Sequence, residues 1–90
     1  MILSETINGM VSKDYKERFI AEFQQLVIRY KGLKKMLDYW DKNELTFTPT
    51  CPRSIYDMQI KTMVDYIAVL VVRANMEGID LEKSFTENEE

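Results

Sequence analysis

The stretch DYKERFIAEFQQLVIRYKGLKKMLDYW, Asp14–Trp40, decides the fold, because its apolar residues recur at the spacing of a helix. Successive apolar positions lie alternately four and three residues apart, and at about 3.6 residues per turn such positions share one face of a helix. These positions are Phe19, Phe23, Leu26, Tyr30, Leu33, Leu37 and Trp40. The stretch therefore predicts a long helix with one continuous packing face.

A second stretch repeats this spacing after a break that contains two prolines, Pro49 and Pro52. A proline in the first turn of a helix removes no hydrogen bond, so Pro52 is expected near the start of the second helix. Gly78 suits the left-handed position that ends a helix. The apolar positions in between are Tyr56, Ile60, Met63, Ile67, Leu70 and Ala74. We predict an all-α fold, a long antiparallel hairpin of helices at about residues 12–40 and 51–77.

The flanking segments complete the predicted organisation, with a hairpin domain at residues 12–78, a short N-terminal arm at 1–11 and an acidic, flexible tail at 79–90. Asp14 is the expected cap of the first helix, with Ser12 as the alternative. In the connection, Phe47 is expected to fold back over the open end of the core. Cys51 is expected to be a small, buried side chain near the start of the second helix.

The composition excludes several classes of function. The 90 residues include one cysteine and no histidine, so an intrachain disulfide, a Cys/His zinc site and His-based catalysis are ruled out. No phosphate-binding glycine loop or catalytic motif is present, so we expect no enzyme, no metal and no cofactor. The longest apolar run, Tyr66–Val72, is too short to span a bilayer, and the first residues do not form a signal peptide. We expect a soluble, intracellular protein without a membrane partner.

Both helices carry more apolar residues than one packing face can hold. A helix that is apolar on several sides must be buried by another element, and another copy of the chain is the expected one. The surplus residues are Ile20, Val27, Ile28 and Met36 in the first helix and Val64, Ala68, Val69, Val71 and Val72 in the second. The sequence therefore predicts a homo-oligomer.

The first helix is basic, although the chain has a net charge of −3. The segment from Lys13 to Asp38 contains seven Lys and Arg residues and four Asp and Glu residues, which gives it a net charge of +3. Tyr15 lies in the first turn beside Lys16 and Arg18, where free N–H groups already favour anions, so a base could stack on the ring while cations meet its phosphate. The alternative is that Tyr15 only packs at the helix start and that the cations are solvated.

Three further cations lie on the first helix, and a fourth, Arg73, lies on the second helix. Arg29, Lys31 and Lys34 lie on the first helix, where the alternative role is a solvated face that pairs with Asp38. Arg73 falls in the most apolar part of the second helix. An arginine there is expected to pair with an acid, to lie at an assembly surface, or to reach a ligand phosphate.

Several short motifs add a family resemblance that runs from about residue 14 to 81. They are DYKER, T-C-P before the second helix, D-Y-I-x-V-L-V-V-R-A within it and E-G-I-D-L after it. With these motifs the chain resembles the phage helical-hairpin family that includes the anti-CBASS type 2 cyclic-oligonucleotide sponge, whose hairpin also occurs in the Thoeris anti-defence type 1 sponge. The resemblance implies a homohexamer in the cytoplasm of the infected bacterium. It would bind and sequester cyclic dinucleotides (cGAMP-like) and cyclic trinucleotides of CBASS immunity without cleaving them.

The resemblance also assigns roles to individual residues. Tyr15 matches the base-stacking tyrosine, and Arg73 matches an arginine linked to cyclic trinucleotides. Lys31 is the best match for a lysine that contacts cyclic-dinucleotide phosphates, with Arg29 and Lys34 as competitors, while Gly32 departs from the family pattern. A two-fold axis would suit the dinucleotide, and a three-fold axis ringed by Arg73 would suit the trinucleotide. Arg73 is therefore expected to lie apart from Tyr15.

Two rival functions follow from the same residues. The surplus apolar surface could dock on a host protein, which would make the chain a small phage interaction module. The basic edge could bind nucleic acid, but the net negative charge and the acidic tail argue against DNA as a partner.

Overall fold

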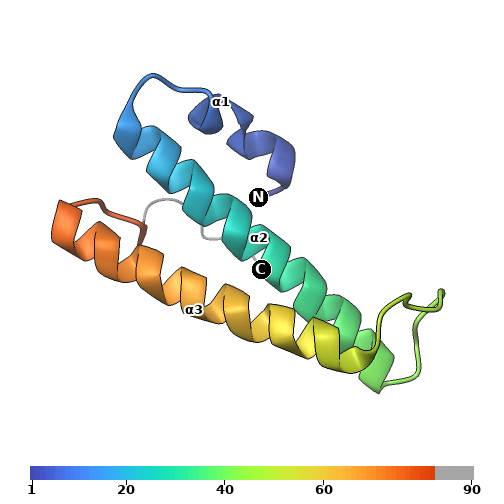
Figure 1. Ribbon diagram of the computed structural model, residues 1–90. Coiled ribbons are helices and arrows are strands. Elements are labelled where there is room, and N and C mark those ends of the chain that lie inside the picture. The colour runs from blue at the N-terminus through green and yellow to red at the C-terminus, as the bar shows by residue number, and fades with distance from the viewer. Residues whose placement is uncertain (83–90) are drawn as a thin grey trace.

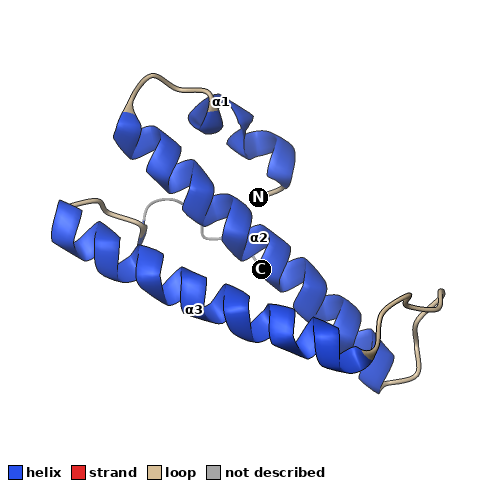
Figure 2. Cartoon of the chain, viewed as in Figure 1, coloured by secondary structure: helices blue, strands red, loops and turns tan. Residues whose placement is uncertain are grey.

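The computed structural model describes residues 1–82 and shows two long antiparallel helices, with two short helical segments packed on the first of them (Figures 1 and 2). In chain order these elements are η1 (Leu3–Thr6), α1 (Ile7–Met10), α2 (Tyr15–Asp41) and α3 (Arg53–Glu77). Residues 1–82 contain no strand. The predicted all-α helical hairpin is confirmed.

The two predicted packing faces meet along the hairpin. Each of their positions is buried or half-buried, as the alternating spacing predicts. The main core lies at the end of the hairpin opposite the connection, where Phe19 of α2 packs with Leu70 and Ala74 of α3, all three at most 3% exposed. This packing fixes the start of α2 beside the end of α3.

The ends of α2 and α3 follow from local hydrogen bonding. The Asp14 carboxylate accepts a hydrogen bond from the Lys16 backbone N–H at 3.0 Å, which confirms Asp14 as the cap of α2. Ser12 does not cap α2 but stabilises the turn before it, because its hydroxyl oxygen accepts a hydrogen bond from the Asp14 backbone N–H at 3.0 Å. Pro52 is the residue before α3 rather than its first residue, so this helix begins at Arg53, slightly later than predicted.

A tight reversal follows α3 and returns the chain to the core. Gly78 has a φ of 72°, which glycine adopts with less strain than residues that carry a Cβ, and this confirms its predicted place at the end of the helix. The Ile79 backbone N–H then donates to the Ala74 carbonyl oxygen at 2.8 Å, and the Ile79 side chain is 7% exposed. Ile79 thus packs on the core, and most of the segment that is predicted to be a flexible tail, residues 83–90, lies outside the described residues.

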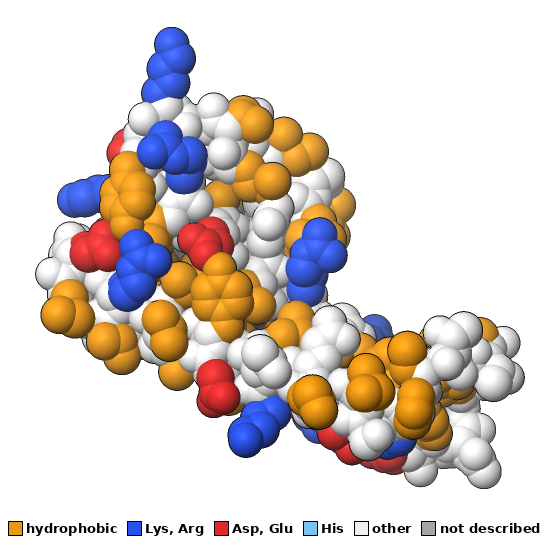
Figure 3. All heavy atoms as spheres, in the orientation of Figure 1, with side chains coloured by type: hydrophobic (Ala, Val, Ile, Leu, Met, Phe, Trp, Pro, Cys, Tyr) orange, Lys and Arg blue, Asp and Glu red, His pale blue; other side chains and the backbone are white. Residues whose placement is uncertain are grey.

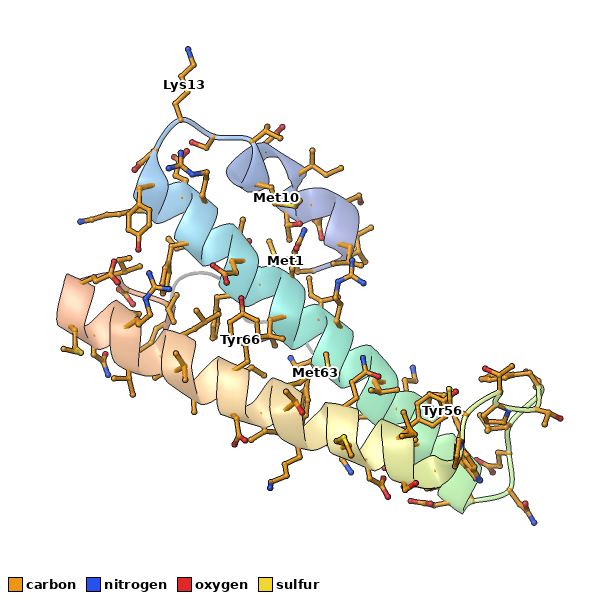
Figure 4. All side chains as sticks on the ribbon, viewed as in Figure 1. Met1, Met10, Lys13, Tyr56, Met63 and Tyr66 are labelled. Carbon is orange, nitrogen blue, oxygen red and sulfur yellow. The ribbon has the colours of Figure 1, made fainter. Side chains whose placement is uncertain are left out.

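The N-terminal arm is helical and lies along α2 on the side away from α3 (Figure 1). The Thr6 side chain is 1% exposed, and its hydroxyl donates to the Leu3 carbonyl oxygen at 2.7 Å. A Cβ at Gly9 would lie 3.0 Å from the Ala21 Cβ, so the arm approaches α2 closely. Met10 faces α2, where its sulfur accepts a hydrogen bond from the Gln25 side chain (Figure 4). The arm is thus an ordered part of the domain.

Two expectations for the connection between the helices are wrong. Phe47 is 55% exposed and does not cover the core, and Cys51 is exposed rather than buried. The reason is that helix side chains already close this end of the hairpin. The rings of Trp40 and Tyr56 lie 5.9 Å apart in an edge-on contact, and the Arg53 guanidinium lies 5.3 Å above the Trp40 ring.

Two glycines allow opposite predictions for the same substitution. Gly78→Ala should lower the free energy of unfolding by about 1 kcal/mol, because alanine is strained at a positive φ. Gly32→Ala should raise it by about 0.5 to 1 kcal/mol, because Gly32 lies inside α2 and a Cβ there meets no atom within 4 Å. Urea unfolding followed by circular dichroism measures both, and equal effects of the two substitutions would contradict this assignment.

Candidate functional site

A cluster of three polar side chains joins the start of α2 to the end of α3. The Tyr15 hydroxyl donates to Glu77 Oε1 at 2.7 Å and accepts from Arg73 Nη2 at 2.7 Å. Arg73 Nε donates to the other carboxylate oxygen, Glu77 Oε2, at 3.2 Å. Each of the three side chains therefore contacts the other two, and we call this group the Tyr15 cluster.

The Tyr15 cluster rests on the core but stays open to solvent. The Arg73 guanidinium lies 4.9 Å above the ring of Phe19, which is buried. The Phe19 ring therefore shields one face of the cation from solvent. The Tyr15 side of the cluster remains accessible, with Tyr15 46% exposed and the Arg73 and Glu77 side chains 44% and 34% exposed. A dissolved ligand can therefore reach both the ring and the cation.

The hydrogen bonds of the cluster shift the acidities of its members. The hydrogen bond to the Glu77 carboxylate raises the pKa of Tyr15 above its ordinary value. The same hydrogen bond, followed by the contact with Arg73, lowers the pKa of Glu77 below its ordinary value of 4.5. At neutral pH the cluster thus contains a neutral phenol, a carboxylate and a guanidinium.

The antiparallel hairpin brings these residues together and corrects one expectation. Arg73 was expected to lie apart from Tyr15, but the two side chains are hydrogen-bonded within one chain, so that expectation is wrong. Of the three roles left open for Arg73, the structure shows pairing with an acid, and the acid is Glu77, four residues later on the same helix. Glu77 was not among the predicted site residues, although its i,i+4 spacing from Arg73 was a usable signal.

A second polar contact crosses the same helix pair nearer the middle of the hairpin. Tyr66 extends from α3 toward α2 (Figure 4), and its hydroxyl donates to the Glu22 carboxylate. This hydrogen bond raises the pKa of Tyr66. Tyr66 lies seven residues before Arg73, which places both side chains on the same face of α3. The two contacts therefore form a polar border along one side of the apolar core.

The other predicted cations lie outside the Tyr15 cluster. Arg18 Nη1 donates to the Ser12 carbonyl oxygen at 2.8 Å, so this side chain holds the turn before α2. Lys16 and Arg29 are exposed on α2. Lys34 pairs with Asp38 at 3.6 Å, which is the contact that the alternative interpretation predicts.

Lys31 lies too far along α2 to join the cluster of its own chain. It follows Tyr15 by 16 residues, which at about 1.5 Å per residue is about 24 Å along the helix. It borders a shallow hollow of about 590 Å³ over the helical Gly32. The residues that line this hollow are Tyr30, Lys31, Gly32, Lys34, Lys35 and Asp38. Tyr15 and Lys31 of one chain therefore do not line the same site.

A larger hollow of about 630 Å³ lies between α2, α3 and the segment after Gly78. Its walls are mainly apolar, and its polar groups are carboxylates and an amide rather than cations. The lining residues are Phe23, Val27, Val71, Ala74, Asn75, Ile79, Asp80, Leu81 and Glu82. This composition does not favour a phosphate ligand.

Apolar side chains cover the outer side of the C-terminal half of α3 (Figure 3). Val69 is 54% exposed, Val72 55% and Met76 81%. Ala68, Val69 and Val72 line a small hollow of about 270 Å³ that also touches Arg73. The exposed apolar surface therefore borders the Tyr15 cluster.

No group of three His, Cys, Asp or Glu side chains in residues 1–82 is arranged to hold a metal ion. In the same residues, neither long helix contains an apolar stretch that could cross a bilayer.

The fold and the cluster define a small all-α protein. Its helical hairpin presents an aromatic ring beside a guanidinium at the end opposite the connection between the two long helices. The chain belongs to the Sequestin family, whose family model matches residues 13–76. Tyr15 and Arg73 lie within the matched residues. Comparison with the curated proteins gives no match to this chain, and neither does comparison with the solved structures. The resemblance to the anti-CBASS type 2 sponge stays a prediction.

The lowered pKa of Glu77 predicts a pH-dependent stability. The unfolded chain takes up this proton at a higher pH than the folded chain, so the contribution of Glu77 is complete above its ordinary pKa of 4.5 and is lost as the pH falls through the lowered value. Glu77→Gln should therefore be less stable than the wild type at pH 7, and the gap should close at acid pH. Urea unfolding at several pH values measures the gap.

The matched control is Asp65→Asn, which removes a carboxylate from an exposed position of α3 outside the cluster. If the gap between the wild type and Glu77→Gln is the same at every pH, the Glu77 carboxylate does not stabilise the fold.

Proposed function

We propose that this protein binds a cyclic oligonucleotide signal of bacterial CBASS immunity and sequesters it, without cleaving it, in the cytoplasm of an infected bacterium. The observation that carries the proposal is the 2.7 Å contact between Tyr15 and Arg73, which puts a stacking ring and a phosphate-binding cation at one exposed position. The family name, Sequestin, agrees with a sequestering role.

The chemistry of the Tyr15 cluster fits a nucleotide better than other small molecules. A tyrosine ring stacks on any base, and a guanidinium binds phosphate oxygens in pairs. A nucleophile or general base would be needed to cut a phosphodiester, and the groups of this cluster are a phenol with a raised pKa and a carboxylate engaged by two donors. The ligand would thus be held intact.

Cyclic dinucleotides and cyclic trinucleotides share the features that this cluster would recognise, namely a base that can stack and at least two phosphate charges. The cyclic di- and trinucleotides are the first candidates, because the sequence motifs resemble the anti-CBASS sponge.

The exposed apolar face of α3 supports an assembly of several copies, with the hexamer as the expected number. Val69, Val72 and Met76 would lose contact with water on association, which is favourable in proportion to the apolar area covered. A second chain is also what would bring a Lys31 near a Tyr15. The rival function, a module that docks on a host protein, would use the same face.

The first test of this proposal is calorimetric titration with a panel of cyclic di- and trinucleotides. Tyr15→Ala should weaken binding of whichever ligand the wild type binds by about 1 to 3 kcal/mol for each base that stacks on the ring. Tyr15→Phe should retain most of the affinity, because it keeps the ring. The matched control is Tyr39→Ala, which removes a tyrosine of similar exposure, 42%, at the other end of α2. Equal affinities of Tyr15→Ala and the wild type would exclude Tyr15 from the site.

The second test is the mass in solution. Light scattering should give a multiple of the 10.7 kDa chain mass, and Val72→Glu should reduce that mass, because it places a charge in the exposed apolar face. Gln59→Glu is the control, since it adds the same charge at an exposed polar position of α3. A wild-type mass of 10.7 kDa at micromolar concentration would contradict the proposed assembly.

A further inference from the structure

The Glu77 carboxylate occupies the groups that would bind a ligand phosphate. It accepts the Tyr15 hydroxyl proton on one oxygen, at 2.7 Å, and the Arg73 Nε proton on the other, at 3.2 Å. Arg73 Nη2, which lies on the same edge of the guanidinium as Nε, donates to the Tyr15 hydroxyl oxygen at 2.7 Å. One full edge of the arginine is therefore engaged inside the protein.

A carboxylate and a phosphodiester present similar groups to an arginine. Each offers two oxygens that share one negative charge, and the Nε–Nη2 edge of a guanidinium can bind either of them through parallel hydrogen bonds. A phosphate that approached this edge of Arg73 would meet the negative charge of Glu77 at the distance of direct contact. The two anions cannot occupy the edge together.

The contact between Arg73 and Glu77 is suited to replacement. Both side chains are more than one third exposed, and an exposed ion pair between residues four apart on a helix is weak. Glu77 is the last residue of α3, directly before the reversal at Gly78, so its side chain can turn into solvent without disturbing a following helical turn. A ligand with several phosphates can displace it.

We propose that Glu77 is an internal competitor for the ligand phosphate, which holds the Nε–Nη2 edge of Arg73 until a multiply charged nucleotide displaces it. This inference rests on the proposed function, in which Tyr15 and Arg73 form the binding site. Glu77 then determines specificity, because a ligand must compensate for the displaced carboxylate. Singly charged nucleotides are disfavoured relative to ligands that bring two or more phosphates.

The test compares wild type, Glu77→Gln and Asp65→Asn. The Gln side chain keeps the shape and an acceptor oxygen for Tyr15 but lacks the charge. The control removes one negative charge 12 residues earlier on α3, about 18 Å away along the helix. The probes are 3′,3′-cyclic GMP–AMP, measured by calorimetry, and inorganic pyrophosphate, measured through the Arg73 Nε–H signal in nuclear magnetic resonance spectra. Circular dichroism confirms that each variant is folded.

Glu77→Gln should tighten binding of both probes about threefold to tenfold, and Asp65→Asn should change it by less than about twofold. Unchanged or weaker binding to Glu77→Gln would overturn the inference, and so would an equal gain in both variants, which would indicate a general charge effect. If 3′,3′-cyclic GMP–AMP binds no variant, the proposed cyclic-dinucleotide ligand is wrong, while the pyrophosphate titration still decides the role of Glu77. An Arg73 signal that does not respond to pyrophosphate in Glu77→Gln also overturns it.

Discussion

The packing of Phe19 against Leu70 and Ala74 is the contact on which the rest of the structure depends. It fixes the register of two antiparallel helices, and in that register the first turn of α2 lies beside the last turn of α3. Without it, Tyr15 and Arg73 would be separated by 58 residues of chain with no reason to meet. The core is small, so the cluster at its edge is both supported by apolar packing and open to solvent.

This arrangement explains how α3 tolerates an arginine in its most apolar stretch. Arg73 does not enter the core, because its guanidinium lies over the edge of it, above the Phe19 ring and against the Glu77 carboxylate. The cation keeps part of its hydration and gains two hydrogen-bonding partners, which avoids the cost of burying an unpaired charge. A group that is stabilised in this way remains available to an incoming anion, whereas a buried ion pair would not.

The helices, their packing faces and their caps could be predicted, because periodicity and cap chemistry are local properties of the sequence. The Asp14 cap and the Gly78 reversal are examples. The connection could not be predicted in the same way, since whether Phe47 or Trp40 closes that end depends on how side chains distant in sequence fit together. Of the candidate site, Tyr15 and Arg73 were identified singly. Their contact and the part played by Glu77 required the register of the hairpin, which periodicity determines only to within a turn.

Recovery of the bound ligand shows whether the Tyr15 cluster holds a cyclic nucleotide intact. The protein is incubated with a mixture of cyclic dinucleotides and cyclic trinucleotides, separated from free nucleotide by size exclusion and heated, and the released material is identified by mass spectrometry. We expect the wild type to release one of these ligands unchanged and Arg73→Ala, shown to be folded, to release far less of it. The proposed sequestration is wrong if no ligand is retained, if linear or hydrolysed products are released, or if Arg73→Ala releases as much ligand as the wild type.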